Sequence, residues 1–243
     1  SDLIEDVGGY INAYTSREVT AYYARVLKND VPLACTILAD ILRNSVLDEK
    51  EIETERGVIL QEIGQSLDTP DDVIFDWLQE TAYPDQPLGR TILGPSERVQ
   101  SFSRSDLQGF IAEHYRPERM ILAAAGGVDH QALVKMAEEH FGDLAAGGPA
   151  ENFGLANFRG GDFRRAKSLE QAHMALAFES PSYRDKDIYA AQIFSIALGG
   201  GMSSRLFQEI REKRGLCYTI FAQTGAFSDT GMTTIYAGTS GEQ

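Results

Sequence analysis

The chain has 243 residues, 43% of them hydrophobic and 24% charged, so it can bury the core of one large domain or two small ones. Its formal net charge is −14, which disfavours nucleic acids and anionic membranes as partners, since both require a basic protein face. Basic peptides and metal cations are the partners that such a charge attracts. The two cysteines, Cys35 and Cys217, are too few for a disulfide framework and are expected to be buried.

The first part of the chain is predicted to combine one β-hairpin with several amphipathic helices. The predicted elements are, in chain order, a helix over 1–6 that ends at Gly8-Gly9, strands over 10–13 and 20–27, and helices that begin at Asp30, Asp48 and Thr69. Pro- and Gly-rich residues 84–95 are expected to form a loop. The N-terminus has neither an initiator Met nor a signal peptide, so we expect the chain to begin inside a larger protein.

The second part of the chain is predicted to continue with helices and strands and to end in a hairpin. The predicted elements are a helix capped by Ser105, a strand over 120–125, a helix capped by Asp129, a strand over 172–178, helices over 186–198 and 203–213, and strands over 216–223 and 233–238. No apolar run approaches the roughly 20 residues of a transmembrane helix.

A pattern of helix, glycine, Tyr-containing strand, polar turn and strand occurs twice, around Gly9 and around Gly215. A repeat at such a long spacing indicates a duplicated domain rather than a solenoid. We therefore predict a first unit over 1–145, a linker over 146–157 and the first half of a second, homologous unit over 158–243, with truncation at both ends. Small residues at 145–150 are the best candidates for a linker.

Two glutamates of the predicted helix at 48–65 are the most informative ionisable residues. Glu55 and Glu62 are seven residues apart and therefore lie on one side of a helix, among apolar residues such as Ile59. A buried carboxylate is costly unless it is paired, hydrogen-bonded or bound to a metal. The spacing alone leaves two interpretations open, namely pairing with a basic residue and a metal or catalytic role.

The other candidate sites carry weaker signals. His114, His130, His140 and His173 show none of the spacings typical of metal-binding histidines. The glycine run Gly199, Gly200 and Gly201 precedes a predicted helix and could suit an anion, but it lacks the lysine of a phosphate-binding loop.

Four segments together carry a resemblance to a known family. They are GGYINAYT at 8–15, ERGVILQE at 55–62, GGGMSSRLF at 199–207 and REKRGLCY at 211–218. In this order they resemble the pitrilysin-type inverted zinc peptidases, and within these the bacterial relatives of the β subunit of the mitochondrial processing peptidase. The resemblance covers essentially the whole chain. It implies an α+β fold of two homologous units, each an antiparallel sheet covered by helices.

The resemblance also implies roles for particular residues. In that family an H-x-x-E-H helix supplies two zinc histidines and a general base, and a distant glutamate is the third ligand. Glu62 matches this ligand, and Glu55 matches the supporting carboxylate. Arg211 and Tyr218 match a pair that contacts the scissile peptide. The remaining matches are to substrate-binding segments, namely the strand Asn12, Ala13, Tyr14 and Thr15, which would take up the substrate as an added strand, and the glycine run 199–201.

The chain departs from the family pattern in one respect, because it contains no H-x-x-E-H sequence. Aligned with the family, this motif would lie just upstream of Ser1. The expected function is that of a zinc metalloendopeptidase whose parent protein cleaves peptides or unfolded, presequence-like polypeptides, with this chain inactive by itself. The alternative is a non-catalytic peptide-binding or structural subunit of the same family. We further expect a cytoplasmic bacterial protein, with the periplasm and the mitochondrial matrix as the alternative locations. It is expected to form a homodimer, or a heterodimer with a related subunit.

Overall fold

The computed structural model describes residues 2–148 and 154–241, and its contacts divide the chain into two units. Unit 1 comprises Ser1–Val58 and Glu97–Glu151, and unit 2 comprises Ile59–Ser96 and Asn152–Gln243. Each unit is thus built from two separate segments. The division expected from the repeat, at 1–145, 146–157 and 158–243, follows homology rather than contacts and stays a prediction. Residues 149–153 of the expected linker lie outside the described residues.

Unit 1 contains one β-hairpin and several helices. Its elements are α1 (Asp2–Glu5), β1 (Tyr10–Thr15), β2 (Thr20–Arg25), η1 (Lys28–Asp30), α2 (Val31–Arg43), the first half of α3 (Glu49–Asp68), most of α5 (Ser96–Ser101), α6 (Arg104–His114), η3 (Pro117–Arg119) and α7 (His130–Phe141). β1 and β2 are antiparallel, with Tyr10 opposite Arg25 and Thr15 opposite Thr20. The Ser16 N–H donates to the Val19 carbonyl at 2.8 Å and closes the polar turn.

Side chains from distant parts of the sequence hold unit 1 together. α2 packs against both α7 and β2. The guanidinium of Arg43 at the end of α2 pairs with Asp143 at 2.8 Å, just beyond α7. The hydroxyls of Tyr22 on β2 and Tyr115 after α6 share a hydrogen bond of 2.9 Å. These contacts connect the hairpin, and therefore the strand β1, to the helical part of the unit.

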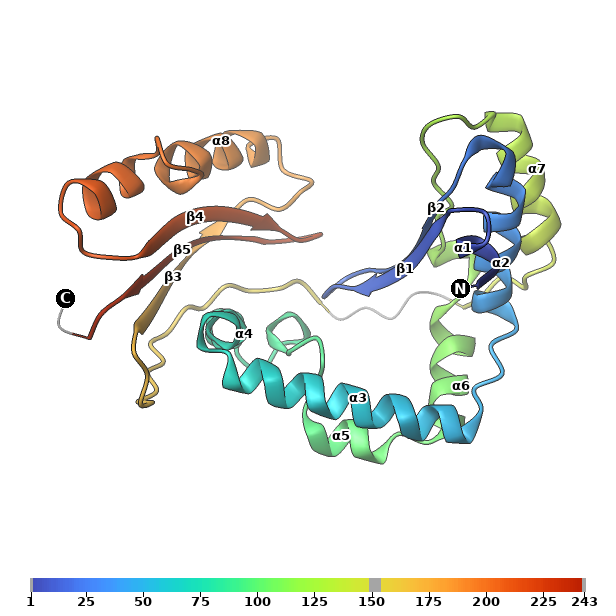
Figure 1. Cartoon of the computed structure of the whole chain (residues 1–243), viewed down its shortest axis with the longest axis horizontal. Helices are drawn as coiled ribbons and strands as arrows, with labels where there is room; N and C mark the ends of the chain where they lie inside the picture. The colour runs from blue at the N-terminus through green and yellow to red at the C-terminus, as the bar shows by residue number, and fades with distance from the viewer. Residues whose placement is uncertain (1, 149–153, 242–243) are drawn as a thin grey trace. The chain divides into compact units, whose positions relative to one another are not determined.

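Unit 2 is a three-stranded antiparallel sheet with a helix on each face (Figure 1). Its elements are the second half of α3, α4 (Pro70–Ala82), η2 (Pro87–Gly89), β3 (Ala172–Ser180), α8 (Ile188–Gly199), the π-helix η4 (Phe207–Glu212), β4 (Thr219–Ala226) and β5 (Gly231–Thr239). The strand order is β3-β5-β4, so β5 is central. Within the described residues, no helix is long and apolar enough to cross a membrane.

The period of two along the strands decides which residues face each helix. On β4, Ala222 and Thr224 face α8, and the Thr224 hydroxyl also bonds to the Thr233 hydroxyl of β5 at 2.9 Å. Phe221 points to the opposite face, where its ring stacks on Phe75 of α4 with centroids 6.2 Å apart. The two helices therefore cover opposite faces of one sheet.

Tyr83, which follows α4, anchors the hairpin formed by β4 and β5. Its side chain is fully buried, and its hydroxyl lies 3.1 Å from the Thr230 hydroxyl and 3.2 Å from the Gly231 carbonyl, to which it donates. Phe158 and Phe227 contact its ring edge to face. Burial raises the pKa of this phenol, so it stays neutral. One aromatic residue thus joins α4, the segment before β3 and the hairpin turn.

The predicted elements are largely confirmed, with three corrections. Ser103 rather than Ser105 caps α6, because the Ser103 hydroxyl accepts the Asp106 N–H and the Asp106 carboxylate accepts the Ser103 N–H in a complete capping box. The strand predicted at 120–125 is wrong, since these residues pair with no strand of the described chain and Ile121 is 93% exposed. The helix α5 was not predicted.

Candidate functional site

The helix α3 carries the two glutamates singled out in the sequence. Seven residues turn an α-helix by nearly two full turns and advance it by about 10 Å, so Glu55 and Glu62 lie along one side of α3. The expectation that they are buried is wrong, because both are exposed and their neighbour Val58 is 42% exposed. Neither glutamate forms an ion pair or hydrogen bond with another of the described residues that would occupy its carboxylate.

Arg56, which follows Glu55, fixes the first half of α3. Its guanidinium donates to the carbonyl of Val99 and, at 2.7 Å, to the carbonyl of Phe102, so it satisfies acceptors at and beyond the end of α5. It also pairs with Glu53 at 3.0 Å, and this pairing lowers the pKa of that exposed carboxyl. The pairing of a glutamate with a basic residue therefore occurs on this helix, but at Glu53 rather than at Glu55.

The described residues supply part of a zinc site and not a complete one. Catalytic zinc sites use three protein ligands, commonly His, Glu or Asp. Within residues 2–148 and 154–241, no three His, Cys, Asp or Glu side chains come close enough together to hold a metal ion. Glu62 can offer one free carboxylate, and a zinc ion would need its other ligands from elsewhere. We therefore derive no chemical step through a metal at this site.

Both cysteines are buried, as expected from the sequence. Burial raises the pKa of the thiols of Cys35 and Cys217, so little thiolate is present at neutral pH. Cys217 forms a small core with Ile220 and Ala237, on which the partly buried Phe207 of η4 packs. The cysteines are thus structural, and Cys217 helps to hold η4 against the sheet.

The structure brings together Arg211 and Tyr218, which were predicted to form a pair across Gly215. Arg211 lies near the end of η4, and its Nε donates to the Tyr218 carbonyl at 2.9 Å. Its guanidinium also pairs with Glu212 at 2.7 Å and lies 4.6 Å from the centroid of the Phe207 ring. A π-helix is uncommon and is found often at functional sites. The contact is with the backbone of Tyr218, so the phenol itself is left free.

Tyr218 immediately precedes β4. Its N–H donates to the Gly238 carbonyl at 2.9 Å, which fixes its backbone against β5. Its side chain is 63% exposed, and none of the described residues forms a hydrogen bond with its hydroxyl. The phenol is thus held by a rigid backbone and has a free donor, as a group that contacts a ligand requires.

The strand from Asn12 to Thr15 lies on β1, as predicted, and these four residues are exposed. Among the described residues β1 pairs only with β2, so its other edge is without a neighbouring strand. On β1 the Ala13 N–H donates to the Asn12 side chain at 2.8 Å. Tyr23 of β2 lies between Tyr10 and Tyr14, with ring centroids 6.2 and 6.3 Å away. Uptake of a peptide as an added strand stays a prediction, which this open edge favours.

The glycine run has a structural explanation at two of its three positions. Gly199 ends α8, and a Cβ atom there would lie 2.3 Å from the Ala222 backbone nitrogen. A Cβ atom on Gly200 would meet the Cα of Ile196 at 2.7 Å. Gly201 has open space, so it is the position of this run best suited to a ligand. The substrate-binding role of all three stays a prediction.

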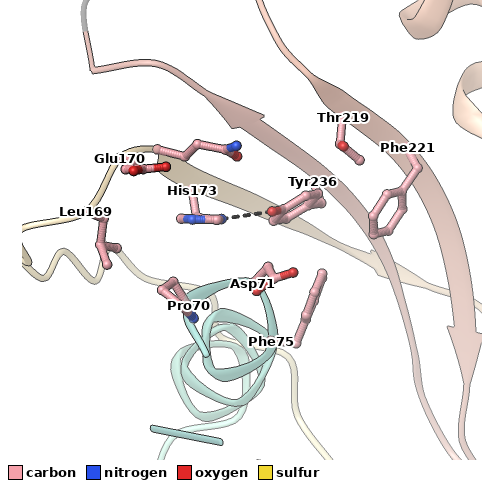
Figure 2. A pocket seen from close by; sticks show the side chains of 10 residues that line it. Pro70, Asp71, Phe75, Leu169, Glu170, His173, Thr219, Phe221 and Tyr236 are labelled. Carbon is pink, nitrogen blue, oxygen red and sulfur yellow. Dashed lines mark hydrogen bonds between the residues drawn. The ribbon is translucent and has the colours of Figure 1, made fainter. Parts of the chain in front are cut away.

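One feature has no counterpart among the sequence predictions, namely a cavity in unit 2 beside Phe75, His173 and Tyr236 (Figure 2). The residues come from segments up to about 160 positions apart, so no local spacing could reveal it.

Comparisons with known proteins show which family matches these features. The profile described as insulinase, peptidase family M16, matches residues 1–96, and the profile described as peptidase M16 inactive domain matches residues 101–243. A protein from Rickettsia felis named "Uncharacterized zinc protease" is 45% identical over 99% of this chain and 58% of its own length. A Bacillus subtilis protein named "Uncharacterized zinc protease YmxG" is 36% identical over 100% of this chain and 59% of its own length.

Solved structures confirm the fold. A protease from Helicobacter pylori has a TM-score of 0.88 at 23% identity, over 98% of this chain and 60% of that chain. A peptidase M16 inactive domain from Pseudomonas fluorescens has a TM-score of 0.88 at 18% identity, over 99% of this chain and 59% of that chain. Together, the two profiles cover nearly the whole sequence, and the chain belongs to peptidase family M16.

Proposed function

We propose that the protein to which this chain belongs is a zinc metalloendopeptidase that cleaves peptides or unfolded polypeptides. The main support is that relatives named zinc proteases match almost the entire chain at up to 45% identity. The chain spans less than two thirds of the length of these relatives, so the activity proposed is that of a longer protein. A catalytic zinc ion supplies Lewis-acid polarisation of a peptide carbonyl and lowers the pKa of bound water.

In this proposal the residues of the chain have separate tasks. Glu62 gives its free carboxylate to the metal, and Glu55, about two turns away on α3, supports the ligand shell. β1 binds the substrate backbone along its open edge, which needs little sequence specificity. Arg211 binds the substrate, and the free hydroxyl of Tyr218 donates a hydrogen bond to the oxygen that becomes negative during cleavage.

The experiment that tests this proposal uses the full-length protein that contains the chain. Glu62→Gln is expected to remove most of the bound zinc and the peptidase activity, because an amide is a far weaker ligand than a carboxylate. Glu55→Gln is expected to lower metal affinity or activity about 10–100-fold. Glu49→Gln, also exposed on α3, is the matched control and should leave both unchanged. If the Glu62 variant keeps full zinc content and activity, the proposal is wrong.

The chain alone is expected to bind zinc weakly and to hydrolyse nothing. One carboxylate cannot replace three protein ligands, and the described residues contain no cluster of three. Metal analysis of the purified 243-residue chain after dialysis measures this directly. Stoichiometric zinc in the dialysed chain would contradict the expectation.

A non-catalytic peptide-binding or structural subunit is the second candidate, favoured by the open edge of β1, which could take up a peptide as an added strand without any metal. Zinc content and peptide turnover of the full-length protein distinguish the two candidates. A subunit without catalysis would bind peptides through β1 and show neither stoichiometric zinc nor turnover.

A further inference from the structure

A small set of contacts fixes the side chain of Arg211 near the end of η4. An arginine guanidinium has three nitrogens, which donate hydrogen bonds and accept none. Nε of Arg211 donates to the Tyr218 carbonyl at 2.9 Å, and Nη1 donates to the Glu212 carboxylate at 2.7 Å. No hydrogen bond joins Nη2 to another residue of the described part of the chain. Nη2 is therefore the nitrogen of this side chain that can still donate to a ligand.

The ring of Phe207 supports the guanidinium from one side. Cζ of Arg211 lies 4.6 Å from the ring centroid, which is within the range of a cation–π interaction. Phe207 itself is partly buried and packs on the core formed by Cys217, Ile220 and Ala237. The ring therefore connects the core of unit 2 to an arginine side chain that is 39% exposed.

Glu212 supports the guanidinium through an ion pair. Neighbouring residues of a regular helix point about 100° apart, so their side chains do not ordinarily face each other. The ion pair of 2.7 Å between Arg211 and Glu212 thus shows that these two side chains turn toward each other. An ion pair this exposed contributes little to the stability of the fold. Its main effect is on where the guanidinium lies.

The contacts of Arg211 restrict its side chain before any ligand arrives. A long arginine side chain has many rotamers, and a ligand that binds it must otherwise restrict them. Here the ring of Phe207, the carboxylate of Glu212 and the carbonyl of Tyr218 already do so. Such preorganisation increases affinity without any new contact to the ligand.

We propose that Phe207 and Glu212 are positioning residues, which hold Arg211 so that its Nη2 donates a hydrogen bond to the substrate. Neither residue needs to contact the substrate, because each acts on the guanidinium. The inference rests on the substrate-binding role proposed above for Arg211. It requires that a change at Phe207 or Glu212 affects substrate binding only while Arg211 is present.

A double-mutant cycle in the full-length protein tests this requirement, with steady-state kinetics on a short peptide. Phe207→Leu keeps an apolar side chain on the core but removes the ring, and is expected to raise KM about 2–5-fold. Glu212→Gln is expected to raise KM about 1.5–5-fold. In both variants kcat and zinc content should change little, because the lost interaction holds substrate and transition state alike. In a protein that already carries Arg211→Ala, neither change should raise KM further.

Phe194→Leu and Glu209→Gln are the matched controls. Phe194 is an aromatic residue of α8 that is 61% exposed, and Glu209 lies on η4 but pairs with Lys213 at 2.6 Å. Both control variants should keep the wild-type KM. Urea unfolding checks that each variant is folded. Because Glu212 is exposed, its variant tests the proposal even where Phe207→Leu disturbs the core.

The cycle separates this inference from the peptidase proposal. The inference is supported if KM rises in the folded single variants and the rise disappears when Arg211 is alanine. It is overturned if a folded Phe207 or Glu212 variant keeps the wild-type KM, or if the same rise occurs without Arg211. Absence of turnover in the wild-type protein would instead contradict the peptidase proposal, and this inference with it.

Discussion

Two junctions of the molecule share one local design in different surroundings. In the first, α1 leads through Gly8 into the hairpin β1–β2, and in the second, η4 leads through Gly215 into the hairpin β4–β5. Both glycines adopt a left-handed backbone conformation, with φ of +70° and +62°. The residue after each glycine closes the helix end, as Gly9 donates to the Ile4 carbonyl at 2.8 Å and Leu216 to the Ile210 carbonyl at 3.1 Å.

The junctions differ in what covers the hairpin. β1 and β2 form a two-stranded ribbon that is largely exposed, whereas β5 is the central strand of a sheet with helices on both faces. The second helix is a π-helix, in which hydrogen bonds join residues five positions apart, and it carries Arg211. A local stop signal is thus enough to end the helix and start the hairpin. Distant contacts decide whether the hairpin stays an exposed ribbon or becomes part of a core.

The largest expected effect concerns Tyr83, the fully buried residue that anchors the second hairpin. Tyr83→Ala is expected to lower the free energy of unfolding of unit 2 by about 3–5 kcal/mol, because it empties a fully buried site. Tyr83→Phe should cost only about 1 kcal/mol, since it removes the hydroxyl alone. The single tryptophan, Trp77, lies in unit 2, so its fluorescence in urea reports this unit. One hydrogen bond contributes about 1 kcal/mol. If the alanine variant loses less free energy of unfolding than this, Tyr83 does not anchor the second hairpin.

The next largest effect on stability is expected at Gly9, which follows Gly8, in contrast to Leu216, which follows Gly215. A Cβ atom on Gly9 would lie 2.8 Å from Cγ2 of Ile4 and 2.9 Å from Cγ1 of Val26, whereas the second junction accommodates Leu216, which is 38% exposed. Gly9→Ala is therefore expected to destabilise unit 1 by about 1–3 kcal/mol through overpacking. Far-UV circular dichroism in urea follows this loss. Leu216→Ala should lower the free energy of unfolding by less than Gly9→Ala. A larger loss in the Leu216 variant would contradict the proposed difference in packing between the two junctions.

Alanine substitutions at the two left-handed glycines should lower the free energy of unfolding by similar amounts. At both Gly8 and Gly215, an added Cβ atom would meet no other atom within 4 Å, so only the positive φ opposes a side chain. Gly8→Ala and Gly215→Ala are each expected to cost about 1–2 kcal/mol. Gly57→Ala, at an open position inside α3, is the control and should be neutral or stabilising. Clearly unequal losses in the two variants would mean that the junctions are not equivalent.

The sequence predicts these junctions because their signals are local. Glycine after a helix, alternation in the strands and caps such as Asp129, whose carboxylate accepts the Ala132 N–H at 2.9 Å, act within a few residues. The sequence pattern centres the first copy of the repeat on Gly9, whereas the backbone places the left-handed residue of that copy at Gly8. Residues 120–125 have the composition of a strand, but a strand also requires a neighbour to pair with.

The candidate site could be predicted only in part. The seven-residue spacing correctly placed Glu55 and Glu62 on one side of a helix, but helical periodicity does not show what covers that side, so their exposure was missed. The sequence paired Arg211 with Tyr218 across Gly215, and the structure joins them by a hydrogen bond from Arg211 to the Tyr218 carbonyl. The cavity beside Tyr236 depends on packing between α4 and the sheet, which no local pattern encodes.

A smaller effect is expected at Arg211, which ties the second junction together. Arg211→Ala removes its hydrogen bond to the Tyr218 carbonyl and should lower the free energy of unfolding by about 0.5–1.5 kcal/mol. In the full-length protein the same change should also raise KM, because Arg211 is proposed to hold the substrate before reaction. Arg211→Lys is the control for charge without the planar guanidinium. An unchanged KM in a folded alanine variant would confine Arg211 to a structural role.

The smallest effect on stability is expected at Tyr218, where the second junction departs most from a purely structural element. Its side chain is 63% exposed and its hydroxyl bonds to none of the described residues, so Tyr218→Phe should change the free energy of unfolding by less than about 0.5 kcal/mol. If the hydroxyl stabilises the developing oxyanion, kcat of the full-length protein falls about 100–1,000-fold with KM and zinc content little changed. Tyr189→Phe on α8, 73% exposed, is the matched control. Steady-state kinetics on a short peptide decides the matter, because wild-type kcat in the Tyr218 variant would leave this residue an exposed aromatic at a strand end and remove the catalytic difference between the two junctions.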